Sequence, residues 1–279
     1  MLATGGMLLL VYALVNAPDV GWGKARTTGE LAGAVVLLSA FVLNEQRHKN
    51  PLAPLSIFRI KGLAAADATG VIAMAGFYSI FFFVTLYMQT VLHLSPIQTG
   101  LAYLPVTVGI VISSGAATQL FARIGTRPIV AGGALISAGA VYWLSRIPVH
   151  GTYVADLLAP LFIMSLGLGC VFVGVQTAAN AGVPADRAGL AAALVNASFQ
   201  LGSALGLAIF SAVATSRTRH LLADHVARPE ALTSGFHRAL LACAIFLLAA
   251  ALIAIRATNT RGEPAHSPVL KTVPVGDTA

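Results

Sequence analysis

Charged residues are scarce in this sequence. Asp, Glu, Lys and Arg make up 10% of the 279 residues, against about 25% in an ordinary soluble domain. Hydrophobic residues make up 57%, and the mean hydropathy is +0.83. This composition excludes a typical soluble domain. It predicts an all-α polytopic membrane protein, because helices satisfy their own backbone hydrogen bonds in lipid.

Cysteine and the motifs of enzyme chemistry are also lacking. The two cysteines, Cys170 and Cys243, lie inside apolar runs, so there is no disulfide framework and no set of cysteine metal ligands. The sequence contains no Walker motif, no HExxH, no GxSxG and no paired carboxylates at helical spacing within the apolar runs. We therefore expect no enzymatic activity, no metal and no cofactor.

The basic balance has a topological explanation. The net charge is +7, from 17 Lys and Arg against 10 Asp and Glu. In a soluble protein this excess would suggest nucleic acid, but in a membrane protein Lys and Arg mark the cytoplasmic loops. Their modest bias predicts a multi-pass protein of the plasma (inner) membrane with both termini in the cytoplasm and no nucleic-acid partner.

Eight apolar runs are long enough to be considered membrane spans. They lie near residues 1–17, 29–45, 63–88, 99–121, 128–146, 154–178, 189–214 and 236–256. The first run has a signal peptide as its alternative, because Val15-Asn16-Ala17 resembles a cleavage site. The lack of a basic segment before this run favours a membrane helix.

The connecting segments divide the chain into regions. A basic, proline-containing connector at 51–62 separates two helices, within 1–50, from six helices within 63–257. The polar tail, 258–279, is predicted to be disordered. A long loop is expected at 215–236, and its His220, Asp224 and His225 have metal-ligand spacing but are interpreted as solvated.

The third run carries the face that most suggests a function. At 100° per residue, one stripe contains Asp67, Val71, Met74, Tyr78, Phe82, Thr85 and Gln89. An ionisable residue in a membrane segment is a functional candidate by default, so Asp67 is predicted to respond to protons or cations. Tyr78, Phe82 and Gln89 are predicted to line a cavity. The alternative is that Asp67 is solvated near Lys61 and that the aromatic rings face lipid.

Polar and small residues recur in the later runs. Gln176 and Asn180, at i and i+4, either line a cavity or cap their helix. Asn196 and Gln200 share a face with Ser203 and are predicted to line a cavity.

Three other features concern helix packing and turns. Gly202 and Gly206 form a GxxxG that allows close helix packing. Pro105 predicts a kink in the fourth run. The basic cytoplasmic turn Arg123-Ile124-Gly125-Thr126-Arg127 makes the fourth and fifth runs antiparallel neighbours.

Four stretches in order resemble a known family. They are Gly21-Trp22 followed by Phe41–Leu52, Leu86–Pro105, the Arg123–Arg127 turn, and Gly189–Ala208. The chain is similar to the C-terminal portion of a major facilitator superfamily transporter of the fourteen-helix drug:H+ antiporter (EmrB/QacA-like) type. The resemblance implies two linker helices and one six-helix bundle, which moves lipophilic compounds against protons by alternating access in the lipid bilayer.

The resemblance also implies an incomplete machine. The first six helices of that family, with their main conserved motifs, have no counterpart in this sequence. The expected function is therefore a partial multidrug efflux antiporter that needs an N-terminal half-transporter or a self-dimer. The alternative is a non-transporting membrane remnant or scaffold from a truncated reading frame.

Overall fold

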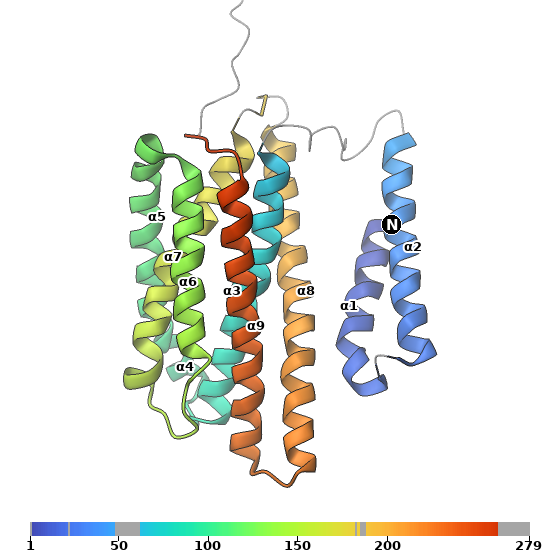
Figure 1. Ribbon diagram of the computed structural model, residues 1–279, viewed down its shortest axis with the longest axis vertical. Coiled ribbons are helices and arrows are strands. Elements are labelled where there is room, and N and C mark those ends of the chain that lie inside the picture. Colours follow the sequence, from blue (N-terminus) through green and yellow to red (C-terminus); the bar gives the residue numbers. More distant parts are fainter. Residues whose placement is uncertain (1, 22, 48–61, 182, 185–187, 262–279) are drawn as a thin grey trace, which may run out of the picture.

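The computed structural model describes residues 2–21, 23–47, 62–181, 183–184 and 188–261. All regular structure in these ranges is helical (Figure 1). The elements are α1 (Leu2–Val20), α2 (Ala25–Arg47), α3 (Leu63–Thr90), α4 (Pro96–Ala102), α5 (Leu104–Ile124), α6 (Thr126–Leu144), a π-helical turn η2 (Tyr153–Leu157), α7 (Leu158–Asn180), α8 (Ala188–Ala223) and α9 (Arg228–Arg256).

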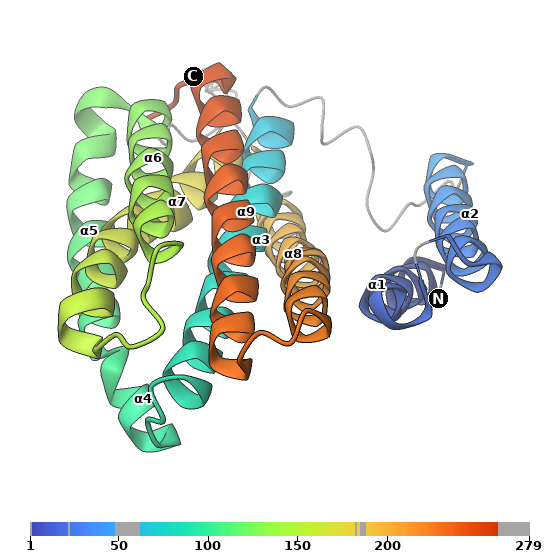
Figure 2. The same cartoon turned by 60° about the horizontal axis from the view of Figure 1, so that its bottom comes forward.

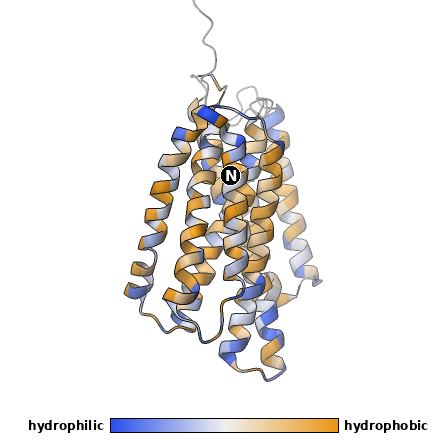
Figure 3. Ribbon diagram, turned by 60° about the vertical axis from the view of Figure 1, so that its left-hand side comes forward, coloured by the Kyte–Doolittle hydropathy of each residue, from blue (hydrophilic) through white to orange (hydrophobic). Residues whose placement is uncertain are grey.

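The prediction of an all-α polytopic membrane protein is confirmed. Seven segments of the described chain are long and apolar enough to cross a membrane: Ala25–Gln46, Leu63–Thr90, Pro96–Ile124, Thr126–Leu144, Tyr153–Asn180, Ala188–Ala223 and Arg228–Arg256. The first expected run forms α1, whose apolar stretch, Leu2–Leu14, is shorter. Hydrophobic residues follow the lengths of the helices, and hydrophilic ones gather toward their ends (Figure 3).

The prediction of a long loop at 215–236 is wrong. α8 continues to Ala223 and α9 begins at Arg228, so only a short turn joins them. Helix α8 therefore extends beyond the apolar run that predicted it, into a polar segment that contains His220. The connector at 51–62 lies almost entirely outside the described residues, and so does the tail beyond residue 261.

Helices α3 to α9 pack in two layers. One layer runs α5, α7, α3, α8, with each helix contacting the next. The other contains α6 and α9, which contact each other. α6 also covers α7, and α9 covers α3 and α8. Figure 2 shows α9 passing in front of α3. The core between the layers is apolar, with Phe77, Tyr87 and Phe210 among its largest fully buried side chains.

The fourth expected run is interrupted rather than kinked at its proline. Ser95 and Gln98 form a capping box that starts α4, with the Ser95 Oγ accepting from the Gln98 N–H and the Gln98 Oε1 accepting from the Ser95 N–H. α4 ends at Ala102, and Tyr103 caps it. Pro105 lies in the first turn of α5, where a missing N–H costs little. The Tyr103 hydroxyl donates to the Phe81 carbonyl of α3 at 3.0 Å, which holds the break against the bundle.

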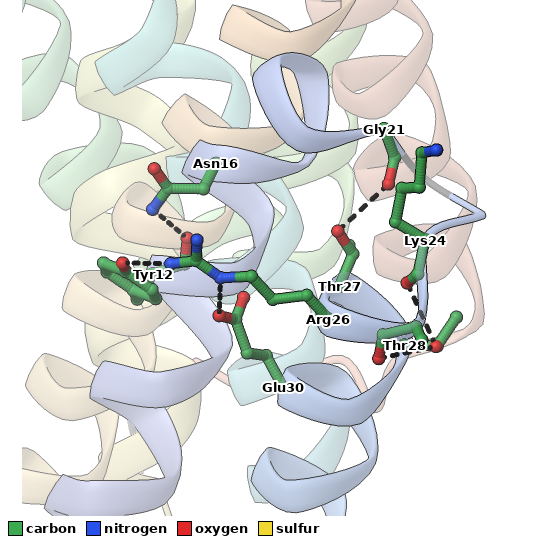
Figure 4. Close-up of polar contacts among 9 residues, drawn as sticks. Tyr12, Asn16, Gly21, Lys24, Arg26, Thr27, Thr28 and Glu30 are labelled. Carbon is green, nitrogen blue, oxygen red and sulfur yellow. Dashed lines mark hydrogen bonds and ion pairs between the residues drawn. The ribbon is translucent and has the colours of Figure 1, made fainter.

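Helices α1 and α2 form a hairpin, and α1 contacts α8. A polar cluster joins the hairpin near its turn (Figure 4). Arg26 contacts Glu30 at 3.0 Å and also donates to the Tyr12 hydroxyl at 2.9 Å. The Thr27 hydroxyl donates to the Gly21 carbonyl at 3.0 Å. These contacts set the register of the two helices at the end of the hairpin.

Candidate functional site

Asp67 is a buried carboxylate in the second turn of α3. Its residue is 6% exposed, and neither carboxyl oxygen has a hydrogen-bond partner among the residues that the structure describes. The Ser198 hydroxyl of α8 lies close to the carboxyl group, but not in hydrogen-bonding geometry. The structure thus places Asp67 inside the bundle and not at a solvated interface. Burying a charged carboxylate without a partner is costly, and uptake of a proton removes that cost.

Asp67 lies at one end of a close contact between α3 and α8. Ser198, Gly202 and Gly206 follow each other at intervals of four residues on α8 and share one face. A Cβ at Gly202 would overlap the Val71 carbonyl, and one at Gly206 would overlap the backbone of Ala75. Asp67, Val71 and Ala75 have the same spacing on α3. The two helices therefore run parallel in register, and we call this contact the α3–α8 seam.

Phe199 of α8 packs against α3 about one turn after Asp67. A Cβ added at Gly70 would lie 2.6 Å from the Phe199 ring, so the ring rests on a glycine of α3. On its other side Phe199 meets Phe172 of α7, with ring centroids 5.4 Å apart. Phe199 is 5% exposed and Phe172 is 43% exposed. The aromatic pair thus packs between α7 and α8 on Gly70, which follows Asp67 by one turn of α3.

The predicted stripe on α3 does not form one surface. Met74 is 2% exposed, whereas Tyr78 is 54% and Phe82 is 41% exposed. Phe82 lines a hollow between α3, α8 and α9, and Gln89 is half-buried in the last turn of α3. Tyr78 is the member of the stripe that is mostly exposed and lies outside that hollow.

The four candidate amide side chains lie on the same two helices as the Phe172–Phe199 pair. Gln176 and Asn180 follow Phe172 on α7, and Asn196 and Gln200 lie on either side of Phe199 on α8. Asn180 donates to the Gln176 carbonyl at 2.8 Å, and Asn196 donates to the Ala192 carbonyl at 3.0 Å, so both bond to their own helix. Asn196 and Gln200 are exposed, and Gln176 is half-buried. The exposed pair places polar side chains on the surface of α8.

The basic turn between α5 and α6 is held by the residues after α9. Gly125 has φ 83°, a conformation that favours glycine. Asn259 accepts from the Arg127 N–H at 3.0 Å and donates to the Ile124 carbonyl at 3.1 Å. The Thr260 carbonyl accepts from the Thr126 N–H at 2.8 Å. Asn259 thus caps the end of one helix and the start of the next, while Arg123 and Arg127 remain exposed.

Sequence reasoning missed Ser198, Phe199 and Asn259. Ser198 carries a usable signal, because it precedes Gly202 by four residues and so shares the face of the GxxxG. Phe199 reads as one more apolar residue in an apolar run. Asn259 lies in a polar segment, and the composition of that segment does not predict a contact with the α5–α6 turn.

Comparison with known proteins places these features in a family. The sequence profile of the Major Facilitator Superfamily matches residues 1–207. The puromycin resistance protein pur8 of Streptomyces alboniger is 34% identical over 84% of the chain and 47% of its own length. The tetracenomycin C resistance and export protein of Streptomyces glaucescens is 32% identical over 80% of the chain and 41% of its own. The cephamycin export protein CmcT of Amycolatopsis lactamdurans is 32% identical over 91% and 51%. The chain thus spans about half the length of these relatives.

Proposed function

Because the chain belongs to the Major Facilitator Superfamily, we propose that it is the C-terminal bundle, with two additional helices, of an exporter that exchanges protons for lipophilic compounds. The relatives described above are resistance and export proteins, which supports export as the direction of transport. The expected subfamily is the fourteen-helix drug:H+ antiporters, in the plasma (inner) membrane with cytoplasmic termini.

Alternating access requires two bundles that rock around a midplane site. Helices α3 to α9 supply one such bundle. We propose that the second comes from a further protein segment, a separate half-transporter or a second copy of this chain. The exposed side chains Tyr78, Phe172, Asn196 and Gln200 then face the substrate path, with the aromatic rings contacting the lipophilic substrate and the amides fixing its orientation.

The single observation that carries the proposal is the buried carboxyl of Asp67 without a hydrogen-bond partner. Ion pathways and proton relays in membranes use such groups. In the proposed cycle Asp67 holds a proton while the Phe172–Phe199 pair covers it. It releases the proton when α7 and α8 separate enough to admit water or a cationic substrate.

The test is export by the assembled transporter in a host that lacks its own efflux pumps. The chain is expressed with its second bundle, and export of a panel of dyes and lipophilic drugs is measured with and without a protonophore. We expect protonophore-sensitive export of at least one compound. The Asp67→Asn variant should lose it, whereas Asp156→Asn should retain it, because Asp156 accepts from the Thr152 N–H and an amide oxygen can do the same. The absence of proton-dependent export across the panel would refute the proposal.

A further inference from the structure

Helices α4 and α5 meet at a break in which one carbonyl has left the helical ladder. The first bond of α5 joins the Thr107 N–H to the Tyr103 carbonyl at 3.1 Å. In a continuous helix the Ala102 carbonyl would accept from the Val106 N–H in the same way. In the structure it accepts from the Tyr153 hydroxyl at 2.6 Å. A side chain from another helical segment thus takes the place of the backbone donor at the break.

The geometry of the break is close to that of a regular helix. Tyr103 has φ −88° and ψ −5°, and a change of about 40° in ψ would bring it to helical values. Pro105 opposes this change, because in a continuous helix its ring would crowd the Leu101 carbonyl. Membrane helices tolerate such a proline as a kink. Two arrangements of the segment thus differ mainly in the donor that the Ala102 carbonyl uses: the hydroxyl in the broken form, and the backbone N–H in the continuous form.

The tyrosine comes from a turn that holds an extra residue. Tyr153 is the first residue of η2, in which the Leu158 N–H donates to the Tyr153 carbonyl five residues back. If η2 changed to α-helical bonding, the residues before it would turn by about 100° relative to α7. Helix α7 keeps its own rotation, because Gly167 lies so close to the Gly133 carbonyl of α6 that a Cβ there would overlap it. The change in η2 therefore moves Tyr153 away from the Ala102 carbonyl.

Helix α4 is bounded by a fixed point and an irregular turn. The Tyr103 hydroxyl donates to the Phe81 carbonyl at 3.0 Å and lies 2.9 Å from the Thr85 hydroxyl, so Tyr103 is anchored to α3. Before α4, His93 has φ 54°, a conformation that is uncommon for residues other than glycine. Figure 2 shows α4 projecting at one edge of the bundle, where α3 and α5 are its main contacts. Helix α4 can therefore pivot at Tyr103 without disturbing the core.

We propose that η2 and the α4–α5 break form one switch. In the structure η2 is π-helical, Tyr153 bonds to the Ala102 carbonyl, and the helix is broken at Tyr103. In the second state η2 is α-helical, Tyr153 is withdrawn, and the Val106 N–H donates to the Ala102 carbonyl, so that α4 continues the line of α5. The switch lies at the end of the bundle opposite the α5–α6 turn (Figure 1), which is external in the topology proposed above. Its role as an external gate rests on the proposed transport function, whereas the switch itself belongs to the bundle.

The experiment measures amide hydrogen exchange of the purified chain in detergent, in the peptide that contains Val106. Tyr153→Phe removes the hydroxyl that holds the Ala102 carbonyl, and it should favour the continuous form. Exchange of the Val106 N–H should then slow about fivefold, as expected for one added hydrogen bond. Pro105→Ala favours the continuous form by a separate route and should slow the same exchange. Deleting Ala155 removes the extra residue of η2 and leaves Tyr153 beside the carbonyl, so it should cancel the slowing caused by Pro105→Ala.

A distance measurement gives a second readout. Spin labels are placed in Ile97→Cys/Leu120→Cys, at two exposed positions of α4 and α5, in a chain whose natural cysteines are replaced by alanine. With Tyr153→Phe the distance should move toward about 35 Å, the length of a continuous helix between these positions.

Tyr142→Phe is the matched control, because Tyr142 is exposed at the same end of the bundle and its hydroxyl accepts from Arg146. It should leave both readouts unchanged. Unchanged or faster exchange of the Val106 N–H in Tyr153→Phe would overturn the proposal, and slowing that persists after deletion of Ala155 would overturn the part assigned to η2. Neither readout requires transport, so the result does not depend on whether the chain exports any compound.

Discussion

The α3–α8 seam makes a quantitative prediction for Gly202→Ala. A Cβ at Gly202 overlaps the Val71 carbonyl, a backbone group that cannot rotate away. Adding a methylene to a packed interior costs about 1–3 kcal/mol, and a clash with backbone belongs at the upper end of that range. Replacing glycine by alanine within a helix returns about 0.5–1 kcal/mol. The net expectation is a loss of about 2 kcal/mol in the free energy of unfolding.

The control for this prediction is Gly139→Ala on α6. Gly139 is also inside a helix, but a Cβ there meets nothing within 4 Å. The helix-propensity gain should then appear alone, as about 0.5–1 kcal/mol of added stability. Both variants are compared with the wild type by circular dichroism during denaturation in the same detergent. If Gly202→Ala were as stable as Gly139→Ala, the close contact between α3 and α8 would be refuted.

Three further predictions follow from the packing. Asn259→Ala should lower stability by about 1 kcal/mol and speed amide hydrogen exchange in the peptide that contains Thr126 and Arg127, and unchanged exchange would contradict the capping of the α5–α6 turn. Tyr103→Phe removes the hydrogen bond to the Phe81 carbonyl and should cost about 1 kcal/mol in the same unfolding assay, so wild-type stability would show that this bond does not hold the helix break. Cys170 is half-buried and Cys243 is fully buried, so maleimide should modify Cys170 first under native conditions, and equal rates would contradict the packing of α9.

Hydropathy predicted most of the membrane architecture. α3, α6 and α7 begin and end within a few residues of the apolar runs, because the lipid sets the length of a spanning helix. The same signal failed at the end of α8. The apolar run that predicted α8 ends just before Arg217 and Arg219. The helix nevertheless continues to Ala223, because a helix can leave the apolar layer without unwinding. Hydropathy therefore located the spans better than the helix ends.

The site was less predictable because it depends on neighbours that are distant in sequence. The period of α3 places Asp67, Tyr78 and Phe82 along one line of the helix. Different helices cover that line at different heights, so Asp67 is buried under α8 while Tyr78 is exposed. Phe199, whose ring packs on Gly70 one turn from Asp67, lies about 130 residues later in the chain. No local pattern in either helix contains that information.

The central claim is that Asp67 carries the proton that is exchanged for substrate. The most direct measurement is proton movement in proteoliposomes that contain the assembled transporter under an imposed pH gradient. Adding a transported lipophilic cation should dissipate the gradient with the wild type and with Asp156→Asn. With Asp67→Asn the cation should still bind but leave the gradient intact. Substrate-dependent dissipation by Asp67→Asn at the wild-type rate would contradict the account.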